Sequence, residues 1–150
     1  MQIILLRHGT RDYKLGDVPL NEIGKNQAQD LASDPALQRV TQLFSSPKKR
    51  ALMTLEPLGE KLGKEIQVHS ELDQMMSHES NSEFKHRVKN FLSHIETLGE
   101  KEVIIISSHS DWLNVALGII PTNALHLNQY MFACAEYLSF EVKDGLWLVD

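Results

Sequence analysis

The sequence predicts a single α/β domain with three layers, in which a mostly parallel central sheet is flanked by helices. The chain has 150 residues, 42% of them hydrophobic, which is enough for one sizeable core. Residues 2–6 and 103–106 are continuous apolar runs, a pattern typical of strands buried on both faces. Helical patterns separate the strand candidates, and this alternation favours a parallel sheet. We expect one domain over residues 1–150.

The strand candidates differ in strength. Residues 2–6 and the β-branched run 103–106 are expected to be central strands, whereas 40–44 and 66–68 are weaker candidates. Residues 137–142 alternate between apolar and polar side chains, as expected of an edge or late strand. The pair Asp144-Gly145 predicts a hairpin turn into a last strand at 146–149.

Two helix starts are predicted in the first half of the chain. Asn21 is expected to cap a helix with apolar residues near helical spacing, ending before Pro35. Ser46-Pro47 predicts a second start, with serine at the cap and proline at the first helical position. Pro57 is expected to kink or end that helix.

Two more helices are predicted in the second half. Ser80 and Glu83 have the spacing of a capping box, and a stripe of apolar residues follows them at helical spacing. A further helix is expected to begin just after His109, around Asp111.

Charge and cysteine content exclude several classes of function. With 20 acidic and 15 basic residues the formal charge is −5, so no global basic field favours nucleic acid or an anionic membrane. The single cysteine, Cys134, excludes an internal disulfide and is expected to be a small buried residue. No apolar run approaches the roughly 20 residues of a membrane span. We expect a cytoplasmic protein whose anionic substrate is captured by a local cluster.

Histidine and arginine follow three predicted strands of the sheet. Arg7-His8 comes after the first strand, Ser45-Ser46-Pro47 leads to Arg50 after the second, and His109 follows the run at 103–106. Because ligands bind beyond the carboxyl ends of such strands, we expect these side chains to meet. Guanidinium groups bind phosphate oxygens, and neutral imidazole can act as a nucleophile. The set therefore predicts phosphate chemistry, although it could also serve binding alone.

The same residues lie in four blocks that resemble the histidine phosphatase superfamily, the phosphoglycerate-mutase-like enzymes. Arg7-His8-Gly9 follows an N-terminal strand, and residues 20–28 resemble the family pattern Leu-Thr-x-x-Gly-x-x-Gln-Ala, with Asn21 for threonine. Residues 45–54 resemble Ser-Ser-Pro-x-x-Arg-Ala-x-x-Thr, and residues 104–109 resemble the strand that ends in a second histidine. The resemblance extends over residues 1–148 and implies a phosphoglycerate-mutase-like fold.

The resemblance also implies roles for these residues. His8 would attack phosphorus in line and become phosphohistidine, while Arg7, Arg50 and His109 would bind the phosphoryl oxygens. Positioning and charge stabilisation are the main requirements of phosphoryl transfer, so no metal or cofactor is expected. Substrate-binding positions are expected next to the two histidines, at Gly9, Thr10 and Ser110.

The sequence departs from the family pattern at the general acid. Many relatives carry Leu-x-Glu after the third strand, but this chain has Leu72-Asp73-Gln74, and an amide cannot deliver a proton. Glu71, Asp73 or Glu79 could substitute, although each is also readily explained as a solvated loop carboxylate. Arg11 stands where the family has a small residue, and its position favours solvent slightly over the phosphate.

A missing acid affects the choice of substrate. Without a proton donor an alkoxide leaves poorly, whereas a phosphoramidate or an anhydride leaves more readily. The sequence in this respect resembles the small bacterial protein-phosphohistidine phosphatases, and we expect phosphohistidine on a partner protein as the substrate. One alternative is a phosphatase of small phosphate esters or anhydrides, such as sugar phosphates or nucleotides, with Glu71 or Asp73 as the acid. Another is a non-catalytic phosphoprotein-binding module.

Overall fold

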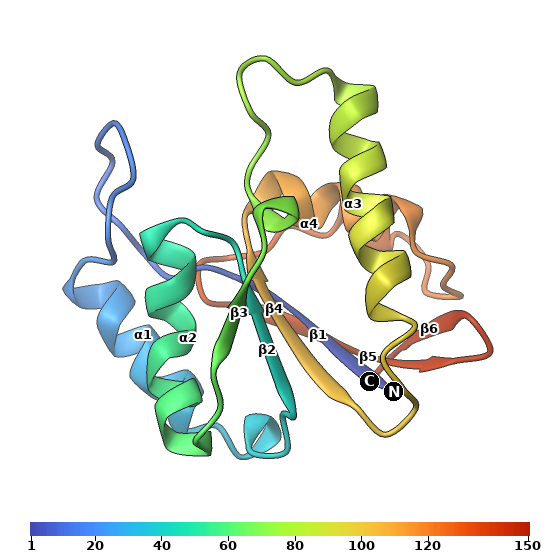
Figure 1. The fold of residues 1–150 in the computed structure, drawn as a ribbon, viewed down its shortest axis with the longest axis horizontal. Helices are drawn as coiled ribbons and strands as arrows, with labels where there is room; N and C mark the ends of the chain where they lie inside the picture. Colours follow the sequence, from blue (N-terminus) through green and yellow to red (C-terminus); the bar gives the residue numbers. More distant parts are fainter.

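Six strands form one sheet in the computed structural model, which describes residues 1–150 (Figure 1). The strands are β1 (Gln2–Arg7), β2 (Gln42–Ser45), β3 (Ile66–Val68), β4 (Val103–Ser108), β5 (Tyr137–Lys143) and β6 (Leu146–Val149). Their order across the sheet is β3-β2-β4-β1-β5-β6. The four strands from β3 to β1 pair in parallel, whereas β5 pairs antiparallel with β1 and β6 pairs antiparallel with β5. The predicted, mostly parallel sheet is confirmed.

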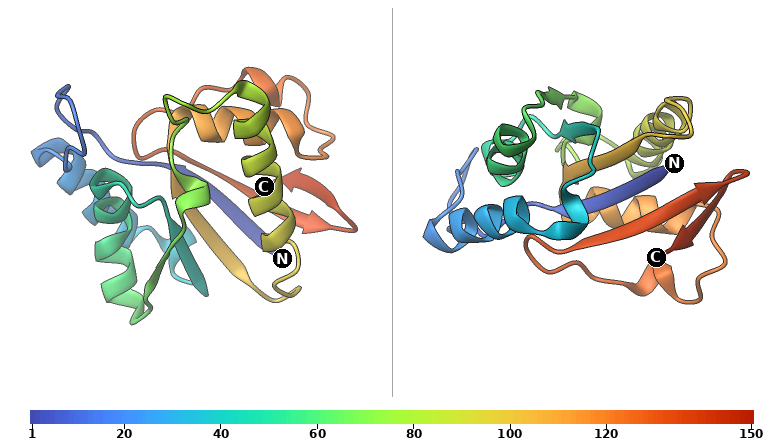
Figure 2. Two further views of the ribbon diagram at one scale, coloured as in Figure 1. Left: turned by 45° about the horizontal axis from the view of Figure 1, so that its top comes forward. Right: turned by 90° about the horizontal axis from the view of Figure 1, so that it is seen from below.

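Helices cover both faces of this sheet, as Figures 1 and 2 show. The helices are α1 (Glu22–Ser33), α2 (Lys49–Leu62), α3 (Asn81–Ile95) and α4 (Ser110–Ile119), with short 3₁₀ turns at Pro35–Leu37, Ser70–Leu72 and Leu127–Gln129. Apolar residues of α1 and α2 form one core with the sheet, and those of α3 and α4 form the other. The expected three layers are therefore present. None of these helices combines the length and apolar character needed to cross a membrane.

Strand β1 is central and is buried on both faces. Ile3 and Leu5 belong to the core under α3 and α4, whereas Ile4 and Leu6 belong to the core under α1 and α2, and all four are 0% exposed. Such alternation follows from the two-residue period of a strand. Burial of each side chain contributes about 1.5–3 kcal/mol. The end of β1 therefore holds Arg7 and His8 at a well-fixed place.

Local signals at several predicted boundaries are confirmed. The Asn21 side chain accepts a hydrogen bond of 3.0 Å from the N–H of Gly24 and caps α1. Ser80 and Glu83 form the complete capping box of α3. Asp144 and Gly145 have φ of 52° and 76°, as a hairpin turn between β5 and β6 requires.

The predicted start of the second helix is wrong. Helix α2 begins at Lys49, and its N-cap residue, Lys48, makes no capping hydrogen bond with its side chain. A remote residue serves instead, because the Asp17 carboxylate accepts a hydrogen bond of 2.8 Å from the N–H of Lys49. The Ser46 hydroxyl accepts only the N–H of Lys48, which precedes the helix, at 3.3 Å, and it also lies 2.8 Å from a ring nitrogen of His109.

Pro57 neither ends nor interrupts α2, which continues to Leu62. Proline in a helix interior removes one backbone hydrogen bond and usually costs about 3 kcal/mol. Here Leu55 and Leu58, on either side of Pro57, are completely buried in the core under α1 and α2. Tertiary packing of this apolar face maintains the helix past the proline. The helix ends where Gly63 adopts a φ of 65°.

Candidate active site

The carboxyl ends of β1, β2 and β4 lead into one pocket with a volume of about 250 Å³. His8 follows β1, Arg50 lies in the first turn of α2, and His109 follows β4. The parallel register of β1 with β4 brings Arg7 beside Ser108, and so the two histidine loops start side by side. Six of the predicted site residues line this pocket: Arg7, His8, Thr10, Arg50, His109 and Ser110.

The hydrogen bonding of His8 determines which ring nitrogen is free. Its Nδ1 lies 2.8 Å from the carbonyl oxygen of Gly9. A carbonyl can only accept, so Nδ1 carries the proton and Nε2 keeps its lone pair. Burial lowers the pKa of His8 to about 4, outweighing the opposite effect of the Gly9 carbonyl. At neutral pH the imidazole is therefore uncharged, with Nε2 available for nucleophilic attack.

His109 lies beside His8, with their ring centroids 5.3 Å apart. Its Nε2 is 2.8 Å from the Ser46 hydroxyl oxygen, which also accepts the N–H of Lys48 at 3.3 Å. Burial lowers the pKa of His109 to about 2, and the neighbouring His8 acts in the same direction. When Ser46 donates to Nε2, the single proton of the neutral ring resides on Nδ1.

Three buried side-chain nitrogens in the chain lack a hydrogen-bond partner, and all three belong to this pocket. They are Nε of Arg7, Nε of Arg50 and Nδ1 of His109. Leaving a buried donor unpaired costs about 1–3 kcal/mol, and such groups in native proteins call for a functional explanation. A phosphoryl group offers several acceptor oxygens in a small volume. The side chains that carry these nitrogens all line the pocket, which makes it the candidate site for an oxyanion.

The two arginines are held by neutral groups. Nη1 of Arg7 donates to the Phe132 carbonyl at 2.8 Å, and Nη2 of Arg50 donates to the Gln74 side-chain oxygen at 2.7 Å. Neither guanidinium forms an ion pair with a carboxylate. Their positive charges are consequently available to a bound anion.

Gly9 lies outside the pocket lining, contrary to the expectation that it binds substrate. Its N–H donates to the Thr54 hydroxyl at 2.8 Å, and that hydroxyl donates to the Arg50 carbonyl at 2.6 Å. A Cβ at Gly9 would lie 3.2 Å from the Gln27 side-chain oxygen and from the Gly24 carbonyl. Close packing against α1 and α2 explains why this position is a glycine, and substrate binding by Gly9 stays a prediction.

Helix α1 also fixes the next residue of the loop. The N–H of Thr10 donates to the Gln27 side-chain oxygen at 2.8 Å. A Cβ at Gly24 would lie only 2.1 Å from the Thr10 carbonyl oxygen, a distance that no real contact allows. The glycine and glutamine of this helix thus hold Thr10 at the pocket wall.

The position of the expected general acid is occupied by Gln74, which lines the pocket. Neither carboxylate suggested as a replacement lines it. Glu71 lies 3.2 Å from Nδ1 of His69, and Asp73 lies 3.3 Å from the ammonium group of Lys48. Asp73 also accepts the N–H of Gln74 at 2.8 Å. Oδ1 of Asp73 also lies 3.8 Å from Nε2 of His109, so this carboxylate borders the site, and an acid role for Glu71 or Asp73 stays a prediction.

Glu79 is likewise committed elsewhere. Its carboxylate forms an ion pair of 2.8 Å with Arg87, and that hydrogen bond lowers the pKa of Glu79 to about 2. Arg87 also donates to the carbonyl groups of Glu71, Asp73 and Gln74. This arginine of α3 therefore holds the loop that carries Gln74, a role that no sequence motif indicates.

Two residues that the sequence predicts to lie elsewhere line the pocket. The sequence favoured a position of Arg11 in solvent slightly over one near the phosphate, but Arg11 lines the pocket together with the highly exposed Tyr13. Cys134 was expected to be buried in the core, but it is only half-buried and lies at the pocket edge. Asp111, near the start of α4, is the one carboxylate in the lining.

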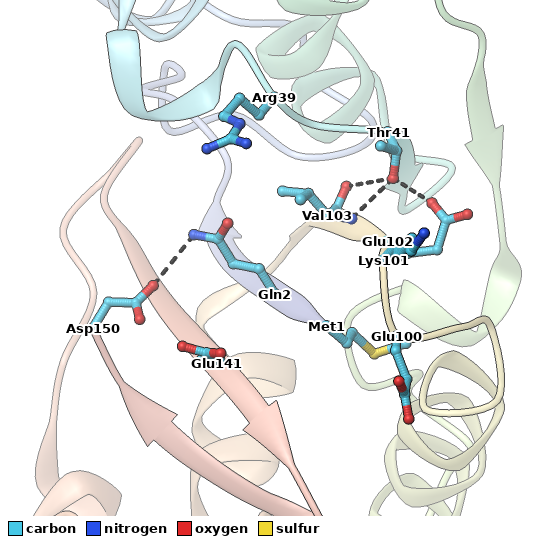
Figure 3. A pocket seen from close by; sticks show the side chains of 10 residues that line it. All are labelled: Met1, Gln2, Arg39, Thr41, Glu100, Lys101, Glu102, Val103, Glu141 and Asp150. Atoms are coloured by element: carbon cyan, nitrogen blue, oxygen red, sulfur yellow. Dashed lines mark hydrogen bonds between the residues drawn. The ribbon is translucent and has the colours of Figure 1, made fainter.

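A larger pocket, of about 580 Å³, lies at the opposite end of the strands, beside the first residues of β1 and β4 (Figure 3). Four carboxylates line it, and no histidine does. Two of its polar side chains already bind each other, since the Thr41 hydroxyl donates to Glu102. This pocket lacks both a nucleophile and a surplus of cations, so the smaller one is the candidate active site.

Two histidines, two unpaired arginines and a set of buried free donors define the class of site: a phosphoryl-transfer centre built on an α/β sheet. The model of the histidine phosphatase superfamily (branch 1) matches residues 3–77, which include His8, Arg50 and Gln74. The chain belongs to this superfamily, which makes it a phosphatase of the hydrolase class. No curated protein sequence matches the chain.

Solved structures with the same fold have low sequence identity. One is from Escherichia coli, assigned as an alpha-ribazole-5′-P phosphatase, with a TM-score of 0.86, 18% identity and coverage of 100% of this chain and 95% of that one. Another is mycobacterial glucosyl-3-phosphoglycerate phosphatase with inorganic phosphate, which has a TM-score of 0.81, 16% identity and coverage of 99% of this chain and 95% of that one. A third is phosphoserine phosphatase from Entamoeba histolytica with 3-phosphoglyceric acid, which has a TM-score of 0.80, 16% identity and coverage of 99% of this chain and 94% of that one.

Proposed function

We propose that this protein hydrolyses small phosphate esters or anhydrides through a phosphohistidine formed on His8. The observation that carries the proposal is the pairing of a neutral His8, whose Nε2 is free, with three unpaired nitrogens on the side chains around it, namely Nε of Arg7, Nε of Arg50 and Nδ1 of His109. A nucleophile alone or a set of donors alone would also suit a binding protein. Their presence in one pocket favours transfer over mere binding.

The proposed reaction has two steps. In the first, Nε2 of His8 attacks phosphorus, the N–P bond forms, and the P–O bond breaks with its electron pair going to the leaving group. In the second, water attacks the same phosphorus and the electron pair of the N–P bond returns to Nε2. Arg7 and Arg50 bind the phosphoryl oxygens in both steps, and Nδ1–H of His109 adds a donor as charge develops.

The size of the pocket supports a small substrate. A volume of about 250 Å³ is slightly below the usual range for drug-sized ligands and fits a phosphoryl group with a short attached group. Structures of the same fold include a phosphoserine phosphatase and a glucosyl-3-phosphoglycerate phosphatase, both named for low-molecular-weight phosphates. This choice departs from our expectation of a protein substrate.

His8→Ala tests the mechanism. We expect the variant to lose turnover of p-nitrophenyl phosphate and to form no acid-labile phosphoenzyme when labelled phosphate donor is mixed with it and quenched. His86→Ala, at an exposed position of α3, is the matched control and should label like the unchanged protein. Equal labelling of His8→Ala and the control would overturn the proposal.

A second candidate, phosphohistidine on a partner protein domain, is favoured by one observation. Gln74 stands where an acid would protonate an alkoxide, and a phosphoramidate needs less help in leaving. The two candidates separate when rates are compared on a phosphohistidine protein, p-nitrophenyl phosphate and a sugar phosphate. A kcat/KM that is at least 100-fold higher on the phosphoprotein would favour this second candidate.

A further inference from the structure

We propose that Arg11 binds a second anionic group of the substrate, one carried by the leaving group. The inference deepens the proposed function, on which it rests, and it concerns a residue of the pocket lining that has no role in the two steps above. The shared chemistry of such a leaving group is a cluster of negatively charged oxygens. Either the second phosphate of a phosphoanhydride or the carboxylate of a carboxylated phosphate ester provides it.

The surroundings of Arg11 leave its charge free. Its side chain lines the pocket, and its own hydrogen bonds are long contacts of 3.3 and 3.5 Å to the carbonyls of Asp12 and Lys14. It forms no ion pair. Its positive charge acts on a neighbouring site residue: burial lowers the pKa of Arg50 most, and the charge of Arg11 lowers it next. Arg11 is thus a cation within the site that lacks a counter-ion.

The single carboxylate in the lining does not serve as that counter-ion. Both oxygens of Asp111 accept main-chain donors, from Met75 at 3.0 Å and from Trp112 at 2.7 Å. The ammonium group of Lys48, another nearby cation, is in contrast paired with Asp73. An incoming anion therefore finds Arg11 unpaired.

The loop that carries Arg11 is held in place before any substrate binds. Arg11 forms a β-bridge with Leu20, and its guanidinium lies 5.8 Å from the ring centroid of Tyr13. The same loop is fastened to α2 through the Asp17 cap on the N–H of Lys49. An anchored backbone reduces the freedom that is lost when Arg11 binds an anion, which favours a specific contact.

The absence of an acid at position 74 gives Arg11 a chemical role. When a P–O–P bond breaks, the bridging oxygen leaves with the electron pair as part of a phosphate, which is stable without a proton. When the P–O bond of a carboxylated ester breaks, the oxygen leaves with the electron pair as an alkoxide and takes a proton from water. Hydrolysis of the phosphohistidine then uses one water, whose hydrogens leave with inorganic phosphate or solvent. A guanidinium next to the departing oxygens stabilises the negative charge that Gln74 cannot neutralise.

The test compares Arg11→Gln with the unchanged protein on pyrophosphate, 3-phosphoglycerate and p-nitrophenyl phosphate. The last lacks a second anionic group. We expect the loss in kcat/KM to be about tenfold larger on one of the first two than on p-nitrophenyl phosphate, and that substrate identifies the anion. Arg39→Gln, in the pocket of Figure 3, is the matched control and should change none of the three rates.

Equal losses of Arg11→Gln on all three substrates, or no loss on any, would overturn this inference. These results leave the proposed function intact, because the phosphoenzyme on His8 is measured separately. Failure of the proposed function is distinct, since the unchanged protein would then turn over none of the substrates and form no phosphoenzyme.

Discussion

The side-chain oxygen of Gln74 accepts a hydrogen bond of 2.7 Å from Nη2 of Arg50. An amide oxygen fixes the guanidinium without cancelling its charge, whereas a carboxylate in the same place would form an ion pair with it. The absence of an acid at position 74 therefore has a second effect besides the loss of a proton donor. The positive charge of Arg50 is not compensated by a carboxylate at position 74 and is available to the phosphoryl group.

Gln74→Glu is expected to raise KM for p-nitrophenyl phosphate by about tenfold, because the new carboxylate competes with the substrate for Arg50. Steady-state rates at neutral pH measure this. Gln74→Met is the control, since it has a similar length and no charge. An increase in kcat/KM for alkyl phosphates in Gln74→Glu would contradict the prediction and show that a glutamate at this position acts as the acid.

Ser46→Ala is expected to lower kcat by about tenfold, because Nε2 of His109 loses its partner and the proton is no longer directed to Nδ1. Ser107→Ala removes a buried hydroxyl of the same size, one that donates to the Ala51 carbonyl, without touching His109. Both variants should lose similar thermal stability. A similar loss of kcat in both would mean that Ser46 acts only through stability.

The free energy of unfolding should fall as the pH drops below 6.5. The pKa values of His8 and His109 are lowered from 6.5 to about 4 and about 2 in the folded protein, so below pH 6.5 the unfolded chain binds more protons. Each group reduces stability by up to about 1.4 kcal/mol per pH unit over its window. Urea unfolding between pH 7 and 5 checks this, and His109→Gln should show a shallower slope by about one proton.

Gly24→Ala is expected to destabilise the protein by about 1–3 kcal/mol and to lower activity, because the added methyl group meets the Thr10 carbonyl oxygen at 2.1 Å. Gly118→Ala is the matched change inside another helix, where nothing lies within 4 Å of the added methyl. That control should gain about 0.5–1 kcal/mol from helix propensity. Thermal unfolding measures the stability of both variants. Equal changes in stability in Gly24→Ala and Gly118→Ala would contradict this explanation of Gly24.

The sequence predicts the sheet, the layers and most helix boundaries, because these depend on local apolar patterns and caps. Asn21 and Ser80 bond to nearby residues of their own helices, and their caps could be predicted. Ser46 could not, because its partner, His109, is 63 positions away. Asp17 illustrates the same limit, since it caps α2 from a loop 32 positions earlier.

The site residues were predictable where a family motif contains them and not where only contacts define them. His8 and Arg50 lie in motifs with fixed spacing. The direction of Arg11 depends on its bridge to Leu20 and on the ring of Tyr13, neither of which has a recognisable pattern. The partners of Glu71 and Asp73 could not be predicted either, because no motif contains the contacts of these carboxylates with His69 and Lys48.

The three unpaired nitrogens of Arg7, Arg50 and His109 also connect ligand concentration to thermal denaturation. An anion that pairs with them binds only the folded chain, so it shifts the unfolding equilibrium by mass action. At a phosphate concentration 100 times its Kd the folded state gains about 2.7 kcal/mol. The melting temperature should accordingly rise with phosphate or vanadate in the buffer more than with chloride at equal ionic strength, even though neither anion is turned over.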